Sequence, residues 1–271
     1  MVLRRRDARY DGAVTATIEQ QRQGDVMVLT LSNEAKRNAL TPALCRQLVD
    51  AVRALAPAGV RAAVLTGAGS RAFSAGFDLG SLDDPEASAA DNPFDPLIDT
   101  VAASPVPLVC ALNGGVFGGG LELAATCDLR VAHPGVKLAI PPARLGIIYA
   151  ARGLNRMSAL VGESRARELF LTARTLDAAE AQAWRLVDHV VPEAEVLPRA
   201  LALAGDMAAL APLAVQGMRR TFEALLAVRA RLSPEATAAL AAAQETAWRS
   251  EDAAEGRRAM AEKRPPVFRG R

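Results

Sequence analysis

The stretch Gly114-Gly115-Val116-Phe117-Gly118-Gly119-Gly120-Leu121-Glu122-Leu123 places five glycines within seven residues, directly before an apolar helical pattern. Glycine has no Cβ, so backbone N–H groups here can approach a ligand closely. The first turn of a helix adds unpaired amides and the positive end of its dipole. Because Glu122 lies in that turn between leucines, the stretch predicts a pocket that stabilises an oxyanion while a carboxyl group moves a proton. Tight helix packing, with Glu122 turned to solvent, is the alternative interpretation.

The composition is ordinary for a soluble globular protein. The chain has 271 residues, of which 51% are hydrophobic and 23% charged, with a net charge of +2. This length is sufficient for a full-sized core, as one domain or as one domain with an appendage. The near-neutral charge gives no reason to expect a nucleic acid or a membrane as a partner.

Cysteine and histidine usage narrows the chemistry further. The three cysteines, Cys45, Cys110 and Cys127, are odd in number and lie in apolar contexts, so they predict reduced core thiols in a cytoplasmic protein. Only two histidines, His133 and His189, are present. Their scarcity argues against a metal site and against a Ser-His-Asp triad.

Strand and helix patterns alternate along most of the chain, which predicts an α/β fold. Residues 13–20 and 25–31 form a predicted hairpin, followed by a helix opened by Thr41-Pro42 that runs to about Leu55. Further strands are expected at 60–66, 105–112, 128–132, 136–140 and 186–191, and helices at 153–161, 164–172 and 178–184. Residues 81–96 are interpreted as a surface loop. We expect a core domain over residues 1–192 and an all-helical region over 193–271, with two or three long helices in 193–264.

Two other glycine-based interpretations are weaker. Residues 64–72 match a strand followed by G-x-G-x-x-A, but no apolar helical stripe follows, as a dinucleotide site requires. The run at 114–120 is not a P-loop, because no Lys-Ser or Lys-Thr follows it. Instead, both glycine segments follow a buried strand, so both could reach the same end of a sheet. The amides of Phe77 and Gly119 could then point at one oxygen, and two amides are enough for an oxyanion hole.

Four motifs in order resemble the enoyl-CoA hydratase/isomerase (crotonase) superfamily over nearly the whole chain. They are Ala35-Lys36-Arg37-Asn38-Ala39-Leu40, Ala72-Phe73-Ser74-Ala75-Gly76-Phe77-Asp78-Leu79, Asn113 to Leu123 with Cys127-Asp128, and Glu262-Lys263-Arg264-Pro265. The resemblance implies a crotonase-like ββα spiral core and a helical C-terminal region that forms homotrimers or hexamers. It implies an acyl-CoA substrate, with coenzyme A present only as part of that substrate and no separate cofactor.

The same resemblance assigns roles to individual residues. The amides of Phe77 and Gly119 would form the oxyanion hole for the thioester. Lys36, Arg37, Ala75, Asp78 and Lys263 would bind coenzyme A, the last of them through its phosphates. A solvated tail charge is the alternative for Lys263. For Asp78 and Asp128, structural roles are favoured: bracing the loop that carries Phe77, and ending the helix that carries Glu122.

Departures from the family pattern limit the expected reaction. Two-carboxylate hydratases place a second Glu where this chain has Pro142, and dienoyl isomerases place an acid where it has Ala150. Glu122 is therefore the single expected acid–base group, with Tyr149 as a second catalytic candidate and Arg152 close by. A Tyr at the position of Tyr149 resembles the decarboxylase branch of the superfamily. Packing of Tyr149 under the C-terminal helices is the structural alternative.

These observations predict a lyase of this superfamily, with an enoyl-CoA hydratase as the leading function. A decarboxylase of malonyl-type acyl-CoA that uses Tyr149 is the first alternative. The second is an acyl-CoA-binding protein with little catalytic activity, which Pro142 in place of the second Glu makes credible.

Overall fold

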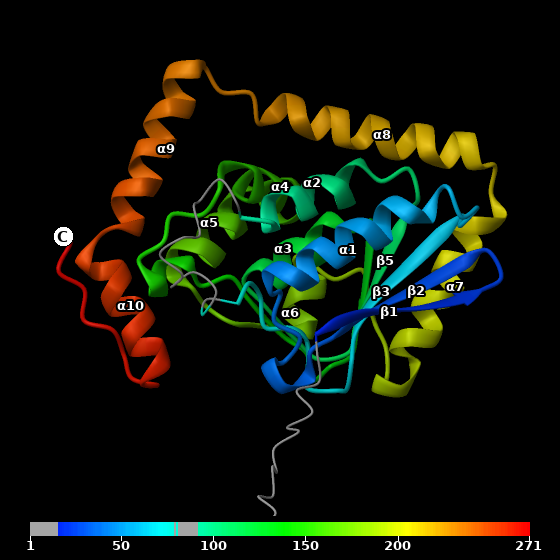
Figure 1. Ribbon diagram of the computed structural model, residues 1–271, viewed down its shortest axis with the longest axis horizontal. Helices are drawn as coiled ribbons and strands as arrows, with labels where there is room; N and C mark the ends of the chain where they lie inside the picture. The colour runs from blue at the N-terminus through cyan, green and yellow to red at the C-terminus, as the bar shows by residue number, and fades with distance from the viewer. Residues whose placement is uncertain (1–15, 79, 81–91) are drawn as a thin grey trace, which may run out of the picture.

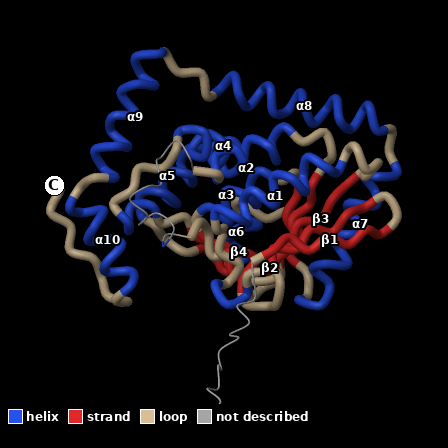
Figure 2. Tube along the Cα trace, in the orientation of Figure 1, coloured by secondary structure: helices blue, strands red, loops and turns tan. Residues whose placement is uncertain are grey.

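The computed structural model describes residues 16–78, 80 and 92–271, and within them two sheets lie together with helices packed around them (Figure 1, Figure 2). The larger sheet has the strand order β1-β2-β3-β5-β7-β10. β1 pairs antiparallel with β2, and the remaining neighbours are parallel. Its strands are β1 (Thr17–Gln23), β2 (Val26–Ser32), β3 (Ala62–Gly67), β5 (Leu108–Leu112), β7 (Leu129–Ala132) and β10 (His189–Val190).

The smaller sheet has the order β4-β6-β8-β9 and is built from very short strands. They are β4 (Ala72–Ser74), β6 (Gly115–Phe117), β8 (Lys137–Ala139) and β9 (Leu176–Asp177), of which only β9 runs antiparallel to its neighbour. Each of β3, β5 and β7 is followed by a short strand of this second sheet and then, further along the chain, by a helix. This repeated β-β-α turn is the predicted spiral.

Ten α-helices surround the sheets in the described residues. They are α1 (Pro42–Leu55), α2 (Phe94–Ala103), α3 (Gly119–Thr126), α4 (Ala151–Val161), α5 (Glu163–Thr172), α6 (Ala178–Ala183), α7 (Val196–Ala209), α8 (Pro212–Arg229), α9 (Pro234–Trp248) and α10 (Glu251–Ala261). Short 3₁₀ helices include η1 (Glu34–Lys36), η4 (Pro142–Leu145) and η5 (Glu193–Glu195). The C-terminal region therefore contains four α-helices, more than the two or three expected over 193–264.

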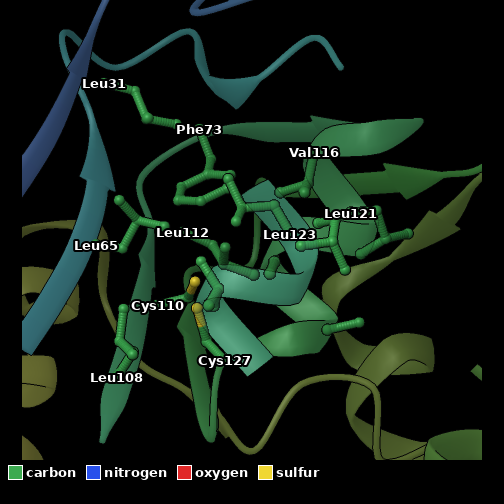
Figure 3. Packing of buried hydrophobic residues seen from close by; sticks show 14 of the residues in the cluster. Leu31, Leu65, Phe73, Leu108, Cys110, Leu112, Val116, Leu121, Leu123 and Cys127 are labelled. Carbon is green, nitrogen blue, oxygen red and sulfur yellow. The ribbon is translucent and has the colours of Figure 1, made fainter. Parts of the chain in front are cut away.

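The large sheet is covered on both faces, which explains why β3 is buried along its whole length. Side chains alternate between the faces of a strand. Accordingly, Ala63 and Leu65 pack into the main core with α1, α2 and α3, whereas Ala62 and Val64 pack against α7. The main core joins both sheets to α3, and Cys110 of β5 lies beside Cys127 within it (Figure 3). All three cysteines are buried and unpaired, as predicted.

The helices beyond α7 extend along the outside of the body (Figure 1). α8 is fixed to it by Arg219, which is 5% exposed and donates to the carbonyls of Val101 and Ala102, each at 2.8 Å. α10 lies against η4, and the chain end folds back on α10 through an Arg264 Nη2–Glu255 Oε2 hydrogen bond of 2.9 Å. Among the described residues, no single helix has the length and hydropathy to cross a membrane, although the bent pair of residues 193–209 and 212–229 passes both criteria together.

Candidate active site

Hydrogen bonds hold the loop that follows β4 in an orientation that directs the backbone N–H of Phe77 away from Leu40. Leu40 N donates to Gly76 O at 2.8 Å, and Asp78 N donates to Leu40 O at 3.1 Å. Because successive residues of an extended segment point in opposite directions, the N–H of Phe77 points away from Leu40. The Ser74 hydroxyl secures the loop from below, since it donates to Asn38 O at 2.8 Å and accepts from Gly76 N at 3.1 Å.

The start of α3 lies directly beside this loop. Gly119 is the first residue of α3, where a backbone amide has no partner within the helix. A Cβ built on Gly76 would stand 3.2 Å from Gly119 N, and one built on Gly119 would stand 3.4 Å from Phe77 N. The amides of Phe77 and Gly119 are therefore neighbours. Across the described residues, no acceptor is recorded for either amide.

Two glycines make this close approach possible. Gly76 has a φ of 94°, which side chains rarely adopt, and its Cβ would lie 2.7 Å from the Phe117 carbonyl oxygen. At Gly119 a Cβ would lie 2.9 Å from the ring of Phe94. The Phe94 ring also makes an edge contact with Phe77, with ring centroids 6.0 Å apart. An aromatic pair from α2 and the β4 loop thus borders the two amides.

Glu122 lies one helical turn after Gly119, on the same side of α3, and is 3% exposed. The alternative in which it turns to solvent is wrong. Its Oε2 accepts a hydrogen bond of 2.6 Å from the Tyr149 hydroxyl, and its Oε1 lies 3.5 Å from Arg152 Nε. Burial raises the pKa of Glu122, and the Tyr149 hydrogen bond and the Arg152 charge only partly oppose that effect. A carboxyl group with a raised pKa is suited to both accepting and donating a proton near neutral pH.

Tyr149 has its ring against Phe170, with centroids 5.1 Å apart, while its hydroxyl lies on Glu122. Burial, followed by the negative charge of Glu122, raises the pKa of Tyr149 well above its usual value. Tyr149 is consequently a phenol that donates to Glu122 throughout the physiological range. Its backbone carbonyl accepts from Gln244 of α9 at 3.4 Å, so Tyr149 also contacts the C-terminal helices, as the packing interpretation expected.

Pro142, the position at which the resemblance would place a second Glu, is buried and opens η4. Ala150 is the residue that precedes α4. In the described residues, the ionisable groups that contact Glu122 are Tyr149 and Arg152. The site therefore holds one buried carboxyl group rather than a pair.

The candidate coenzyme A residues fall into three places. Lys36 forms a 2.7 Å ion pair with Asp78, and Asp78 also accepts from Gly80 N at 3.3 Å, so Asp78 braces the Phe77 loop. Ala75 N donates to Arg37 O at 2.9 Å, and Arg37 lines a cleft of about 380 Å³. Lys263 is exposed, just beyond the end of α10.

The cleft beside Arg37 is cationic. Its other lining residues are Arg71, Ala72, Gly115, Phe117, Gly135 and Lys137. It lies at the beginning of β4, β6 and β8, whereas the amide pair follows the ends of β4 and β6. Among the described residues no carboxylate lines it, and its charged lining residues are Arg37, Arg71 and Lys137.

The prediction that Asp128 ends the helix carrying Glu122 is wrong. Its carboxylate accepts from Leu108 N at 2.7 Å and from Arg219 Nε at 3.0 Å, which ties the start of β5 to α8. α3 ends before it, at Thr126.

Two residues of the site went unrecognised in the sequence: Phe94 and Asp95, at the start of α2. Asp95 is an ion-pair partner of Arg152. Residues 81–96 are interpreted from composition as a loop; residues 81–91 lie outside the described part, but 94–96 begin α2. Phe94, Leu97, Ile98 and Val101 recur at helical spacing and are all buried, and that spacing is the sequence signal that would have located α2.

Paired sheets in a β-β-α spiral, with two glycine-dependent amides beside a buried carboxyl group, define a crotonase-type fold and site. The chain belongs to the enoyl-CoA hydratase/isomerase family, whose sequence profile matches residues 21–271. It is 38% identical over 248 residues to a probable enoyl-CoA hydratase (echA6) of Mycobacterium tuberculosis, covering 90% of this chain and 96% of that protein. It is 36% identical over 257 residues to the 2,3-dehydroadipyl-CoA hydratase of Escherichia coli, covering 92% and 97%.

Solved structures agree with this membership. A methylmalonyl-CoA decarboxylase in complex with 2-nitronate-propionyl-CoA superimposes with a TM-score of 0.89 and 26% identity, covering 94% of this chain and 99% of that one. A carnitinyl-CoA hydratase from Mycobacterium avium superimposes with a TM-score of 0.82 and 30% identity, covering 95% and 100%. The fold therefore occurs in proteins named for different reactions of coenzyme A esters.

Proposed function

We propose that this protein hydrates the double bond of a 2-enoyl-CoA thioester, with Glu122 as its only catalytic carboxyl group. The observation that carries the proposal is the position of Glu122, buried one turn beyond the Gly119 amide and within hydrogen-bond distance of Tyr149. Relatives named as hydratases of coenzyme A esters, at 36% to 38% identity, support the same reaction class.

The amides of Phe77 and Gly119 would bind the thioester carbonyl oxygen and hold the negative charge that develops on it. One such donor contributes about 3 to 4 kcal/mol of transition-state stabilisation in a comparable oxyanion hole. Ionised Glu122 would take a proton from water as the water oxygen bonds to the β-carbon. The same carboxyl group would then deliver that proton to the α-carbon as the enolate collapses. Water is thus added across the double bond by a single acid–base group.

Decarboxylation of a malonyl-type acyl-CoA is the second candidate, favoured by the TM-score of 0.89 to a methylmalonyl-CoA decarboxylase. In that reaction the bond from the α-carbon to the carboxylate breaks, its electrons form the same enolate, and carbon dioxide leaves. Tyr149 would donate to the departing carboxylate. The 2.6 Å bond from Tyr149 to Glu122 favours hydration, because it makes the phenol a partner of the acid–base group.

Turnover assays on two variants separate the candidates. Glu122→Gln is expected to lower crotonyl-CoA hydration about 1000-fold, the usual contribution of a general acid–base group, whereas Tyr149→Phe lowers it only about 5-fold. Release of carbon dioxide from methylmalonyl-CoA that depends on Tyr149 and survives Glu122→Gln would instead establish the decarboxylase. Tight binding of acyl-CoA esters with no turnover by the wild type would contradict both.

We further propose that the cationic cleft beside Arg37 binds the phosphates of coenzyme A. Lys36, Asp78 and Ala75 would contact the remainder of coenzyme A along its path to the amide pair. Three cations without a lining carboxylate support this assignment. Arg37→Ala should raise KM for an acyl-CoA and leave KM for the matching acyl-pantetheine unchanged. Equal effects on both would contradict it. Lys263 would reach the phosphates from a neighbouring subunit, and coenzyme A enters only as part of the substrate, with no separate cofactor.

A homotrimer, or a hexamer of two trimers, is the proposed assembly, in the cytoplasm. An exposed apolar face on α8 supports association, because large apolar patches on a surface mark interaction sites. Its members include Met218, Phe222, Leu225 and Val228, which are 56% to 72% exposed. The buried reduced thiols, with burial raising the pKa of Cys45 to about 12, fit a reducing compartment. Light scattering after size exclusion should give three or six chains, and a monomer would contradict the assembly.

A further inference from the structure

A row of charged side chains crosses from α2 to the buried carboxyl group of α3. The terminal nitrogens of Arg152 face α2, where Nη2 pairs closely with Asp95 and Nη1 lies 3.7 Å from Asp99. Only Nε of the same guanidinium faces Glu122, at 3.5 Å from Oε1. Side chains of α2 and of α3 therefore both contact one arginine of α4.

The sharing of Arg152 among these carboxylates is uneven. A guanidinium binds a carboxylate most strongly through two parallel N–H groups, one to each oxygen. Glu122 receives one long contact instead, and its other oxygen is occupied by Tyr149 at 2.6 Å. Oε1 is consequently the Glu122 oxygen with the weaker partner, and under the proposed function it is the one that exchanges a proton with the substrate.

We propose that Asp95 is a positioning residue for Glu122: it holds the Arg152 guanidinium toward α2, so that Arg152 does not form a two-pronged ion pair with the acid–base carboxyl group. This inference rests on the proposed role of Glu122. It goes beyond that role because it assigns a function to a residue on another helix that touches Glu122 only through Arg152. In the absence of Asp95, the side chain of Arg152 turns onto Oε1 and occupies it.

Few other charged groups near Glu122 could hold Arg152 in this orientation. In the part of the chain that the structure describes, the charged or titratable groups facing it are Tyr149 before α4, Arg152 on α4, and Asp95 and Asp99 on α2. The Arg152 charge lowers the pKa of Glu122 and the Asp95 charge raises it, in agreement with a balance set across these helices.

Asp95 is also well placed to respond to substrate. The preceding residue, Phe94, is 8% exposed and its ring borders Gly119 and Phe77. The helix that holds Arg152 away from Glu122 is thus the helix that borders the two amides. Asp95 itself is half exposed, with its side chain 55% accessible, so Asp95→Asn removes a charge without opening the core.

Titration of Tyr149 by NMR tests the inference without any need for turnover. The sequence contains two tyrosines, so labelling the ζ-carbon of tyrosine gives two resonances, and a Tyr10→Phe background leaves Tyr149 alone. Because the Tyr149 hydroxyl donates to Glu122, its resonance reports the ionisation of that carboxyl group. Glu122→Gln must abolish the titration, which verifies the assignment.

We expect Asp95→Asn to move the titration to lower pH and Arg152→Met to move it to higher pH. The decisive sample is the double variant: with Arg152 replaced, the Asp95→Asn shift should largely disappear. Asp99→Asn, the matched loss of charge on the same helix, should give a clearly smaller shift. A shift for Asp95→Asn that is unchanged in the Arg152→Met background, or equalled by Asp99→Asn, would overturn the proposal, because Asp95 would then act only as a nearby charge.

The same variants separate this inference from the proposed function. In the hydration assay, Asp95→Asn should lower kcat about 10-fold and move the acid limb of the pH profile to lower pH. If the variants show the coupled NMR shifts but the wild-type protein hydrates no enoyl-CoA, the proposed function is refuted and the positioning role stands. Hydration that depends on Glu122, without the coupling, would refute the positioning role alone.

Discussion

The amide pair and the carboxyl cluster lie side by side but are built in opposite ways. The amides of Phe77 and Gly119 are main-chain groups, aimed by a strand end and a helix start and held by Ser74 and the Leu40 bridge. The cluster around Glu122 consists of side chains from α2, α3, α4 and the loop before α4. A substitution alters the amide pair only if it moves the backbone, whereas it alters the carboxyl cluster directly when it replaces one of the side chains.

This difference explains how one fold can serve several reactions. A backbone oxyanion site is retained whatever side chains surround it, and the enolate of a thioester is common to hydration and decarboxylation. Here Pro142 stands where the resemblance would place the second carboxyl group of a hydratase pair, and Arg152 and Asp95 lie around the remaining one. We therefore expect glycine replacements to lower activity by displacing the amides. Replacements in the carboxyl cluster should instead act by changing the protonation of Glu122.

Within the backbone half, the largest effect is expected for Gly76→Ala. The new methyl group would meet the Phe117 carbonyl oxygen at 2.7 Å at a φ of 94°, so the loop must move and take the Phe77 amide with it. Losing one oxyanion donor lowers kcat about 100-fold, and the left-handed conformation lowers the free energy of unfolding by about 1 to 2 kcal/mol. Hydration kinetics and chemical denaturation measure the two.

Gly59→Ala is the matched control, since Gly59 has a φ of 69° but its Cβ would meet nothing within 4 Å. It should lose similar stability and keep full kcat. A Gly76→Ala enzyme with unchanged kcat would show that the Phe77 amide takes no part in the reaction.

A smaller effect, about 10-fold on kcat, is expected for Gly119→Ala, because the methyl group meets the Phe94 ring at 2.9 Å and a side chain can yield partly. Adding Phe94→Leu to Gly119→Ala should restore most of the activity by making room for that methyl group. No rescue would place the defect in the helix start itself rather than in its contact with α2.

For the carboxyl half, Tyr149→Phe should lower kcat about 5-fold, the effect of one ordinary hydrogen bond of about 1 kcal/mol. A hydrogen bond to the ionised carboxylate lowers the pKa of Glu122, so its loss raises that pKa further above its usual value. The acid limb of the pH–rate profile should therefore move to higher pH. A limb that stays in place would mean that the contact does not persist in solution.

The smallest effect is a gain in stability from Glu122→Gln. Burial raises the pKa of Glu122 in the folded state, so between its unfolded and folded pKa values the folded protein binds the extra proton. Stability therefore falls as pH rises through this window. Gln does not titrate, so the variant should match the wild type below the window and have the higher Tm above it. A variant that loses Tm at neutral pH would contradict a net penalty for the buried charge.

The sequence predicted the backbone half of the site better than the side-chain half. A glycine run before a helix has local physical meaning, so Gly119 and Glu122 could be picked out directly, and the order of motifs indicated the spiral. The glycine run also contains β6, which was not expected, because a three-residue strand starting at glycine has no periodicity to detect. β4 was missed for the same reason of length.

The ion pairs of the cluster could not be derived from sequence patterns. Asp95 and Arg152 are 57 residues apart, and only the packing of α2 and of α4 against α3 brings them together. The same holds for Asp128 and Arg219, which are 91 residues apart. Local spacing predicts helices and caps, whereas contacts of this kind depend on the finished fold.

A structure of the protein bound to a non-reactive saturated acyl-CoA thioester tests the central claim most directly. We expect its thioester oxygen about 2.7 to 3.1 Å from both Phe77 N and Gly119 N, with Glu122 facing the α- and β-carbons. A bound ligand whose thioester oxygen lies away from both nitrogens, or whose reacting carbons face away from Glu122, would contradict it.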